Sequence, residues 1–137
     1  MTRDTATLTP PAEPLTGAVT LPGSKSVTNR ALLVAALAQG TSTLTGLLRS
    51  DDTRHMMTAL RQMGVEIEEL SETSLRITGQ GGLRQPDAPL FLGNAGTAVR
   101  FLTAAVALVD GPVTITGDEH MQNRPIAPLI DTLVSLG

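Results

Sequence analysis

The sequence predicts a mixed α/β fold built from repeated strand–helix units. Hydrophobic residues make up 41% of the 137 residues but aromatic ones only 1%, so the core must be aliphatic, which suits helices packed on sheets. Apolar residues recur at strand spacing and at helical spacing in turn along the chain. The segment 40–46 also matches the segment 111–117, and each is followed by a polar loop and an amphipathic helix.

Turn and cap residues predict the elements of the first repeat. The polar, proline-rich residues 1–14 are expected to form a flexible arm, and Ala18–Leu21 alternates like a short strand. Ser24 can cap a helix because its oxygen accepts hydrogen bonds from first-turn N–H groups, and Ser50 with two aspartates can cap the next one. The expected elements are a helix over 25–39, a strand over 41–47, a helix over 52–63 and a hairpin of strands over 65–70 and 74–78.

The second repeat begins in the same way but lacks closing strands. Its expected elements are a strand over 90–92, a helix over 97–109, a strand over 113–116 and a helix over 125–136 with Pro125 in its first turn. Without closing strands, a sheet edge and an apolar helix face would stay uncovered. We therefore expect the chain to be truncated relative to its stable form, or to be completed by another polypeptide.

Composition excludes several classes of partner and chemistry. The net charge of −3 argues against the broad cationic face that a nucleic-acid-binding protein needs. The absence of cysteine excludes disulfides, thiolate metal sites and cysteine nucleophiles. The first residues carry no apolar signal core, and no apolar run reaches membrane-spanning length. A soluble cytoplasmic protein without nucleic-acid or membrane partners is predicted.

Polar and basic side chains gather at the start of the first predicted helix. The first N–H groups of a helix lack intrahelical partners and carry partial positive charge, so anions bind there readily. Ser26 and Arg30 are four residues apart and therefore share one helix face, while Lys25 stands at the helix start. An ammonium, a hydroxyl and a guanidinium are thus expected around one small volume.

The helix start of the second repeat follows the same plan. Gly96 lets the backbone approach a ligand closely, and Asn94 and Thr97 supply side-chain polar groups. Arg100 lies one turn into the helix, and Arg124 stands just before the last helix. Two helix starts built alike, each with an arginine, predict a site that holds more than one anionic group.

Other polar residues give weaker signals. His55 is expected to be a surface or interface histidine, and His120 follows two acidic residues that form either a solvated cluster or a metal site. Asp51 and Asp52 are expected to cap a helix, with the alternative that one of them orients a nearby arginine. No Ser–His–Asp arrangement and no spaced carboxylate pair stands out, so no catalytic residue and no metal ligand is predicted within this chain.

Three motifs resemble the EPSP synthase (3-phosphoshikimate 1-carboxyvinyltransferase) family: Leu21–Leu33, Ser50–Met56 and Leu90–Arg100. The resemblance runs from about residue 14 to the end. It implies an inside-out α/β barrel fold, in which two domains of three βαβαββ units each enclose the active site. Residues 15–22 would be the opening strand of the first, discontinuous domain. Residues 23–137 would be part of the second domain, with one full unit to about residue 79 and one truncated unit from about residue 88.

The resemblance also implies a reaction and a set of binding residues. The family transfers the enolpyruvyl group of phosphoenolpyruvate to the 5-hydroxyl of shikimate 3-phosphate through a tetrahedral intermediate, releasing phosphate without a metal or organic cofactor. By resemblance, shikimate 3-phosphate would be bound by Lys25, Ser26 and Arg30, with Lys25 also reaching phosphoenolpyruvate. Gly96 and Arg124 would line the phosphoenolpyruvate site, and its wall would be shaped by Asn94, Thr97 and Arg100.

This chain departs from the family pattern in two ways. Phe101 stands where many relatives have proline, which leaves the response to the inhibitor glyphosate open. Family members are also much longer, and the groups credited with proton transfer lie in their later part, so the chain alone is expected to be inactive. The related UDP-N-acetylglucosamine enolpyruvyl transferases resemble Gly-x-Lys-Asn at the opening motif and carry a reactive cysteine, so that family is set aside. A non-catalytic anion-binding or assembly module with the same fold remains the alternative.

Overall fold

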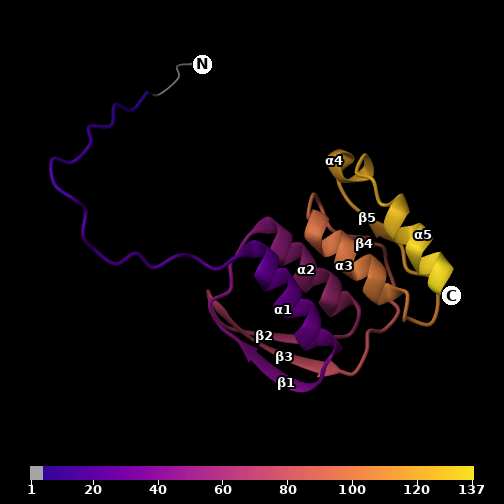
Figure 1. Ribbon diagram of the computed structural model, residues 1–137. Coiled ribbons are helices and arrows are strands. Elements are labelled where there is room, and N and C mark those ends of the chain that lie inside the picture. Colours follow the sequence, from indigo (N-terminus) through magenta and orange to yellow (C-terminus); the bar gives the residue numbers. More distant parts are fainter. Residues whose placement is uncertain (1–4) are drawn as a thin grey trace.

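Helices cover one face of a three-stranded sheet in the first half of the chain, and a second, smaller helix–strand layer follows (Figure 1). The structure is a computed structural model that describes residues 5–137. The first half holds α1 (Lys25–Leu37), β1 (Gln39–Leu44), α2 (Asp51–Gln62), β2 (Glu66–Ser71) and β3 (Ser74–Gln80). The second half holds β4 (Leu90–Phe91), α3 (Gly96–Val106), β5 (Ile115–Thr116), α4 (Glu119–Gln122) and α5 (Ala127–Leu136). The predicted mixed α/β fold is confirmed.

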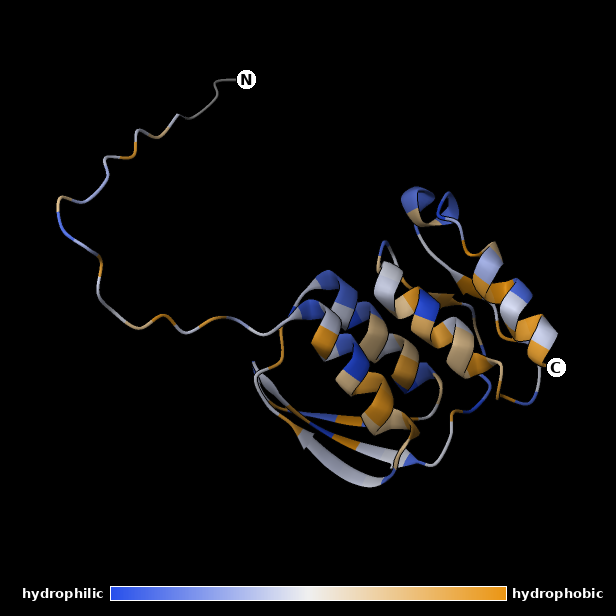
Figure 2. Ribbon diagram, in the orientation of Figure 1, coloured by the Kyte–Doolittle hydropathy of each residue, from blue (hydrophilic) through white to orange (hydrophobic). Residues whose placement is uncertain are grey.

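Strand β3 lies at the centre of the first sheet. It pairs antiparallel with β1 on one side and with β2 on the other, and Ile77 stands opposite Ser42 and Ile67. Its side chains alternate as the pleat requires, with Leu75 and Ile77 buried and Arg76 exposed. The predicted hairpin of β2 and β3 is therefore confirmed, and its apolar side forms the floor on which α1 and α2 pack (Figure 2).

Serine caps fix where α1 and α2 begin. The Ser24 hydroxyl accepts a hydrogen bond from the Val27 N–H at 3.4 Å. Ser50 and Thr53 form a reciprocal capping box, in which each side chain accepts from the other residue's backbone N–H. Both caps were predicted, and each typically contributes about 1 kcal/mol to stability. They hold the first turns of the two helices in place at one end of the molecule.

Ion pairs join the outer part of the sheet to α2 and to the loop before it. Arg61 on α2 donates a hydrogen bond to the Glu69 carboxylate on β2 at 3.1 Å, and Arg49 pairs with the same carboxylate at 3.0 Å. The hydrogen bond from Arg61 and the charge of Arg49 hold the pKa of Glu69 below its usual range. The carboxylate thus stays ionised and pairs with both arginines at the β2 edge of the sheet, away from the helix starts.

The second half repeats the plan with fewer strands. β4 and β5 form a two-stranded parallel sheet in which Leu90 stands opposite Ile115. α3 packs on α1 and α2 through a fully buried Leu102. α5 contacts α3 but has no buried residue, and Ile130 and Val134 are 41% and 75% exposed. The apolar side of α5 is therefore largely uncovered.

The predicted strand over Ala18–Leu21 is absent from the described residues. Residues 5–24 form no helix or strand, and Val19 is 84% exposed. A strand requires a hydrogen-bonded neighbour, and none of residues 5–137 provides one for this segment. Residues 5–14 are exposed, while residues 1–4 of the predicted arm lie outside the described residues. The assignment of 15–22 to another domain stays a prediction.

Three smaller differences concern the helices of the second half: one end, one start and one additional short helix. α3 ends at Val106 rather than at 109, and α5 begins at Ala127, so Pro128 rather than Pro125 stands in its first turn. The short helix α4 was not predicted; Asp118 caps it by accepting from the Met121 N–H at 2.9 Å.

Within residues 5–137, no helix has both the length and the apolar character needed to cross a membrane.

A substitution of Gly79 on β3 tests how closely the sheet approaches α1. A Cβ built there would lie 2.2 Å from the Ala38 carbonyl oxygen and 2.5 Å from that of Ala35, and backbone atoms cannot move aside cheaply. We expect Gly79→Ala to lower the free energy of unfolding by about 2 kcal/mol, measured by urea denaturation. The matched control is Gly82→Ala, because a Cβ there meets nothing within 4 Å. Equal stability of the two variants would show that the sheet and α1 are not in close contact.

Candidate anion-binding site

The first turns of three helices border a polar cavity of about 230 Å³. α1, α2 and α3 lie side by side, and the starts of α1 and α2 are joined by an ion pair (Figure 1). A loop between α4 and α5 closes the remaining side. The cavity is lined by Lys25, Asp52, Asn94, Gly96, Thr97, Arg100 and Arg124. Six of the eight residues predicted from the sequence are therefore brought together here.

An ion pair joins the starts of α1 and α2. The Lys25 ammonium lies 3.0 Å from the Asp52 carboxylate oxygen Oδ2. The Lys25 side chain is 48% exposed, whereas that of Asp52 is only 21% exposed. The lysine can therefore turn toward a ligand in the cavity, while the aspartate stays close to the protein.

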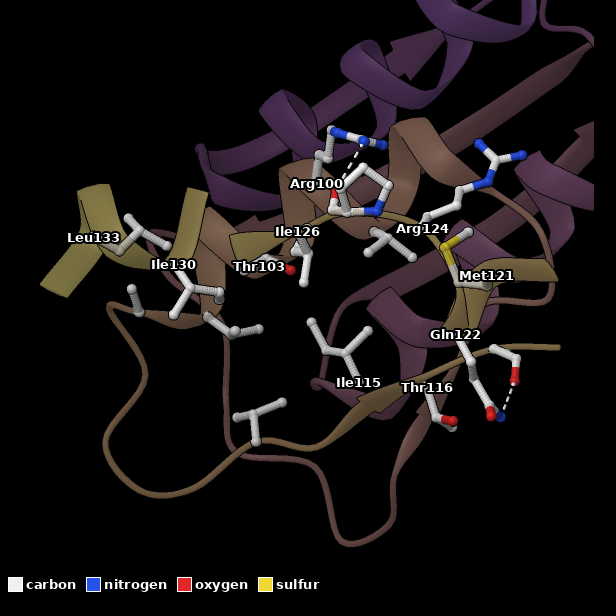
Figure 3. A pocket seen from close by; sticks show the side chains of 16 residues that line it. Arg100, Thr103, Ile115, Thr116, Met121, Gln122, Arg124, Ile126, Ile130 and Leu133 are labelled. Atoms are coloured by element: carbon white, nitrogen blue, oxygen red, sulfur yellow. Dashed lines mark hydrogen bonds between the residues drawn. The ribbon is translucent and has the colours of Figure 1, made fainter. Parts of the chain in front are cut away.

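Arg100 joins the start of α3 to the segment before α5. Its guanidinium donates to the Pro125 carbonyl at 3.2 Å (Figure 3). It also donates to the Gly96 carbonyl at 3.4 Å. Arg124 is next to Pro125, and its Nη1 would lie 2.5 Å from a Cβ placed on Gly96. The absence of a side chain at Gly96 is thus what lets the Arg124 guanidinium lie against the first turn of α3.

The cavity carries positive charge in a chain whose net charge is −3. Three cationic side chains face a single carboxylate, which leaves an excess of two positive charges. The start of α3 adds to this, because Ala95 at its N-cap position makes no side-chain cap hydrogen bond. The N–H groups of that turn are not satisfied by a capping side chain and favour negative charge. The arrangement suits a phosphate or a carboxylate.

Ser26 and Arg30 do not line this cavity. Arg30 donates to the Ser26 carbonyl oxygen at 3.1 Å, so the two residues do share a helix face as predicted. The Arg30 guanidinium lies over the Phe101 ring at 5.1 Å, a cation–π contact between α1 and α3. Together they form an exposed polar surface beside the cavity rather than part of its wall.

Asp52 is the site residue that sequence reasoning misplaced. It was expected to cap a helix or to orient an arginine, but it pairs with Lys25, which is 27 positions earlier in the chain. Asp51 pairs with Arg54 within α2. His55 makes an edge contact with Phe91 at 5.5 Å between ring centroids. Among residues 5–137, no group of three or more His, Cys, Asp or Glu side chains could hold a metal ion.

A larger cavity of about 520 Å³ lies between α3, β5 and α5 (Figure 3). Aliphatic side chains such as Ile115, Ile126 and Ile130 dominate its lining, with Arg100 and Arg124 along one edge. It offers few groups that could hold an anion. We call it the apolar groove, and we assign the anion chemistry to the smaller polar cavity.

The sequence profile of EPSP synthase (3-phosphoshikimate 1-carboxyvinyltransferase) matches residues 9–137. The chain belongs to the EPSP synthase family. The 3-phosphoshikimate 1-carboxyvinyltransferase of Rhizobium leguminosarum bv. trifolii (strain WSM2304) is 63% identical over 131 residues, covering 96% of this chain and 31% of the relative. That of Pseudomonas syringae pv. syringae (strain B728a) is 55% identical over 133 residues, covering 97% of this chain and 32% of the relative.

A solved structure supports the same family at the level of the fold. EPSP synthase from Acinetobacter baumannii matches with a TM-score of 0.83 and 35% identity, over 88% of this chain and 28% of that chain. The mixed α/β architecture is therefore that of part of an EPSP synthase. The chain spans about a third of the length of the curated relatives that it matches.

The contact between Gly96 and Arg124 yields a direct test of the cavity. In Gly96→Ala, the new methyl group must displace the Arg124 guanidinium, because the side-chain end moves more easily than the helix. We expect the variant to stay folded and to bind inorganic phosphate about tenfold more weakly, measured by isothermal titration calorimetry. The control is Gly17→Ala, where a Cβ meets nothing within 4 Å. Unchanged affinity in Gly96→Ala would remove Arg124 from the site.

Proposed function

We propose that this chain supplies substrate-binding groups of a 3-phosphoshikimate 1-carboxyvinyltransferase. In this reaction the 5-hydroxyl oxygen of shikimate 3-phosphate adds to phosphoenolpyruvate, and the tetrahedral intermediate then loses phosphate to give the enolpyruvyl ether. The observation that carries the proposal is the cavity in which Lys25, Arg100 and Arg124 converge on the first turn of α3. A cytoplasmic location stays a prediction from the composition. Independence of metals and organic cofactors stays a prediction from the family resemblance.

The charges of the cavity fit phosphoenolpyruvate. Its phosphate and carboxylate are both anionic, and the cavity has an excess of two positive charges in a small volume. In the proposal, Arg124 and the first turn of α3 at Gly96 hold phosphoenolpyruvate. Asn94, Thr97 and Arg100 shape the wall around it. Positive charge at this place also stabilises the phosphate as it leaves.

Shikimate 3-phosphate is assigned to the surface beside the cavity. Ser26 and Arg30 present a hydroxyl and a guanidinium there, and Lys25 lies between that surface and the cavity. Lys25 is half-exposed and flexible, so it can reach a phosphate on either side. Two neighbouring anion sites that share one lysine would bring the two acidic substrates together.

Proton transfer is assigned to groups outside residues 1–137. Asp52 is the one carboxylate that lines the cavity of the described chain, and it is paired with Lys25. The Lys25 ammonium occupies this carboxylate at 3.0 Å, so the proposal gives it no role as a general base. In the proposal, residues 1–137 bind substrates and the complementary C-terminal polypeptide supplies the acid and the base.

The apolar groove is the surface that we assign to this complementary polypeptide. In the first repeat, β3 lies between β1 and β2 and pairs with both of them. In the second repeat, β5 pairs only with β4 among the described strands, and the groove beside it is lined by aliphatic side chains. Strands placed there would pair with β5 and bury Ile130 and Leu133 of α5.

A non-catalytic anion-binding or assembly module is the second candidate. All seven residues that line the polar cavity come from this one chain, so anion binding does not require a second polypeptide. The two candidates make the same prediction for binding and opposite predictions for turnover.

A phosphate-release assay with shikimate 3-phosphate and phosphoenolpyruvate separates the two candidates. We expect no turnover by the 137-residue chain alone, because the groups for proton transfer are missing from it. Turnover should appear when the remaining C-terminal part of a family member is added as a separate polypeptide. Turnover by the chain alone would contradict the assignment of proton transfer, and no turnover in the mixture would favour the non-catalytic module.

Substitutions of Lys25 and Arg30 test the assignment of shikimate 3-phosphate. In the complete enzyme we expect Lys25→Ala and Arg30→Ala each to raise the dissociation constant of this substrate about tenfold to a hundredfold, because each removes a charge-assisted hydrogen bond. Arg54→Ala is the matched control, since its side chain is 69% exposed and pairs with Asp51 on the surface of α2. Normal affinity in both test variants, measured by calorimetry, would refute the assignment.

A further inference from the structure

Asn29 on α1 breaks the rule that buried polar groups are hydrogen-bonded. Its side chain is fully buried, and within residues 5–137 neither Oδ1 nor Nδ2 has a hydrogen-bond partner. A carboxamide brings two donor hydrogens and one acceptor oxygen, and burying them unpaired opposes folding. A leucine of similar size would avoid that penalty. Residues that break such local rules are concentrated at functional sites, where another state of the protein uses them.

The neighbours of Asn29 along α1 show where it lies. On one side, the Thr28 hydroxyl accepts from the Leu48 N–H at 3.1 Å, so this flank of α1 faces the loop before α2. On the other side, the Arg30 guanidinium lies over the Phe101 ring, so that flank faces α3. Asn29 comes between them around the helix. It therefore faces the junction where α1 meets both α2 and α3.

Asn29 stands on the same face of α1 as Lys25, which lines the polar cavity. It follows Lys25 by one helical turn and shares its face of α1. Side chains on a helix lean toward its N-terminus, so the carboxamide is directed toward the level of Lys25. At that level Lys25 pairs with Asp52, whose side chain is only 21% exposed. Helix geometry thus directs the unpartnered amide toward the level of a partly buried carboxylate.

A bound anion changes which partners are available to the Asp52 carboxylate. The Lys25 ammonium cannot stay fully paired with Asp52 and also turn to a phosphate in the cavity. When it turns away, Asp52 is left with little solvent and with no cation at 3.0 Å. A partly buried carboxylate in this condition gains from a new hydrogen-bond donor. A neutral donor is favourable here, because a cationic one would hold the carboxylate as Lys25 does and compete for the anion.

We propose that Asn29 is a positioning residue that donates a hydrogen bond from Nδ2 to the Asp52 carboxylate when an anion draws Lys25 into the cavity. The inference rests on the proposed function, in which this cavity binds an anion. Asn29 does not touch the anion. It acts through Asp52 by stabilising the state in which Lys25 is free to bind the anion. In the other state, in which Lys25 and Asp52 form their ion pair, the Asn29 side chain has no hydrogen-bond partner.

Sulfate is a suitable probe, because it is a dianion that does not titrate near neutral pH. We expect Asn29→Leu in the 137-residue chain to melt at or above the wild-type temperature, since no hydrogen bond is lost, and to bind sulfate about tenfold more weakly. Thr28→Val is the matched control at the neighbouring buried position. It loses the bond to the Leu48 N–H, so it should melt at a lower temperature and bind sulfate normally. Wild-type affinity in Asn29→Leu would overturn the proposal.

A double-mutant cycle tests whether Asn29 acts through Asp52. In an Asp52→Ala background the acceptor oxygens are gone, so adding Asn29→Leu should have no further effect on sulfate affinity. A tenfold loss that persists in this background would mean that the amide serves the anion by another route, and the proposal would be wrong.

Nuclear magnetic resonance of the wild-type chain gives a readout that needs no substitution of Asn29. On saturation with sulfate, the side-chain NH₂ resonances of Asn29 should move downfield as the new hydrogen bond forms. If Lys25→Ala abolishes sulfate binding while the Asn29 resonances of the wild type stay fixed, the anion site stands and this inference fails. If the wild-type chain binds no sulfate, or if Lys25→Ala binds it normally, the proposed anion site fails and the inference fails with it.

Discussion

The ion pair between Lys25 and Asp52 is the interaction on which the site depends. It joins the first turn of α1 to the first turn of α2 at the end of the molecule where α3 also begins. Serine caps hold both turns in their helical geometry, so the backbone that carries Lys25 and Asp52 stands at fixed places. A rigid frame that carries one mobile cation suits a site that must hold a charged ligand and release it.

Local placement of charge allows an acidic chain to hold acidic ligands. The overall charge of −3 gives no general attraction for anions, but three cations and the start of α3 border one small cavity. Arg100 contributes in two ways, since it bonds backbone carbonyls on both sides of the cavity and adds charge to its wall. The aliphatic groove beside it has the opposite character, and for this reason we propose different partners for the two hollows, an anion in one and a polypeptide in the other.

Features set by local chemistry could be predicted from the sequence, and features set by pairing between distant segments could not. Ser24 and Ser50 were identified as caps because a cap depends on residues three positions away. The strand over Ala18–Leu21 was wrong because alternation permits a strand but only a partner strand creates one. The grouping of Arg100 and Arg124 at one site was predicted from the repeat, but Arg30 does not line that cavity. The Lys25–Asp52 pair had no local signal, and neither did the burial of Asn29.

The central claim is that anionic substrate binds where the three helices begin. The most direct measurement is a titration of the ¹⁵N-labelled chain with phosphoenolpyruvate, followed residue by residue. Resonances of Lys25, Gly96 and Arg124 should shift together with one dissociation constant, while those of Ile130 and Leu133 in the apolar groove stay in place. Shifts centred on the groove, with none at Lys25, would contradict this account.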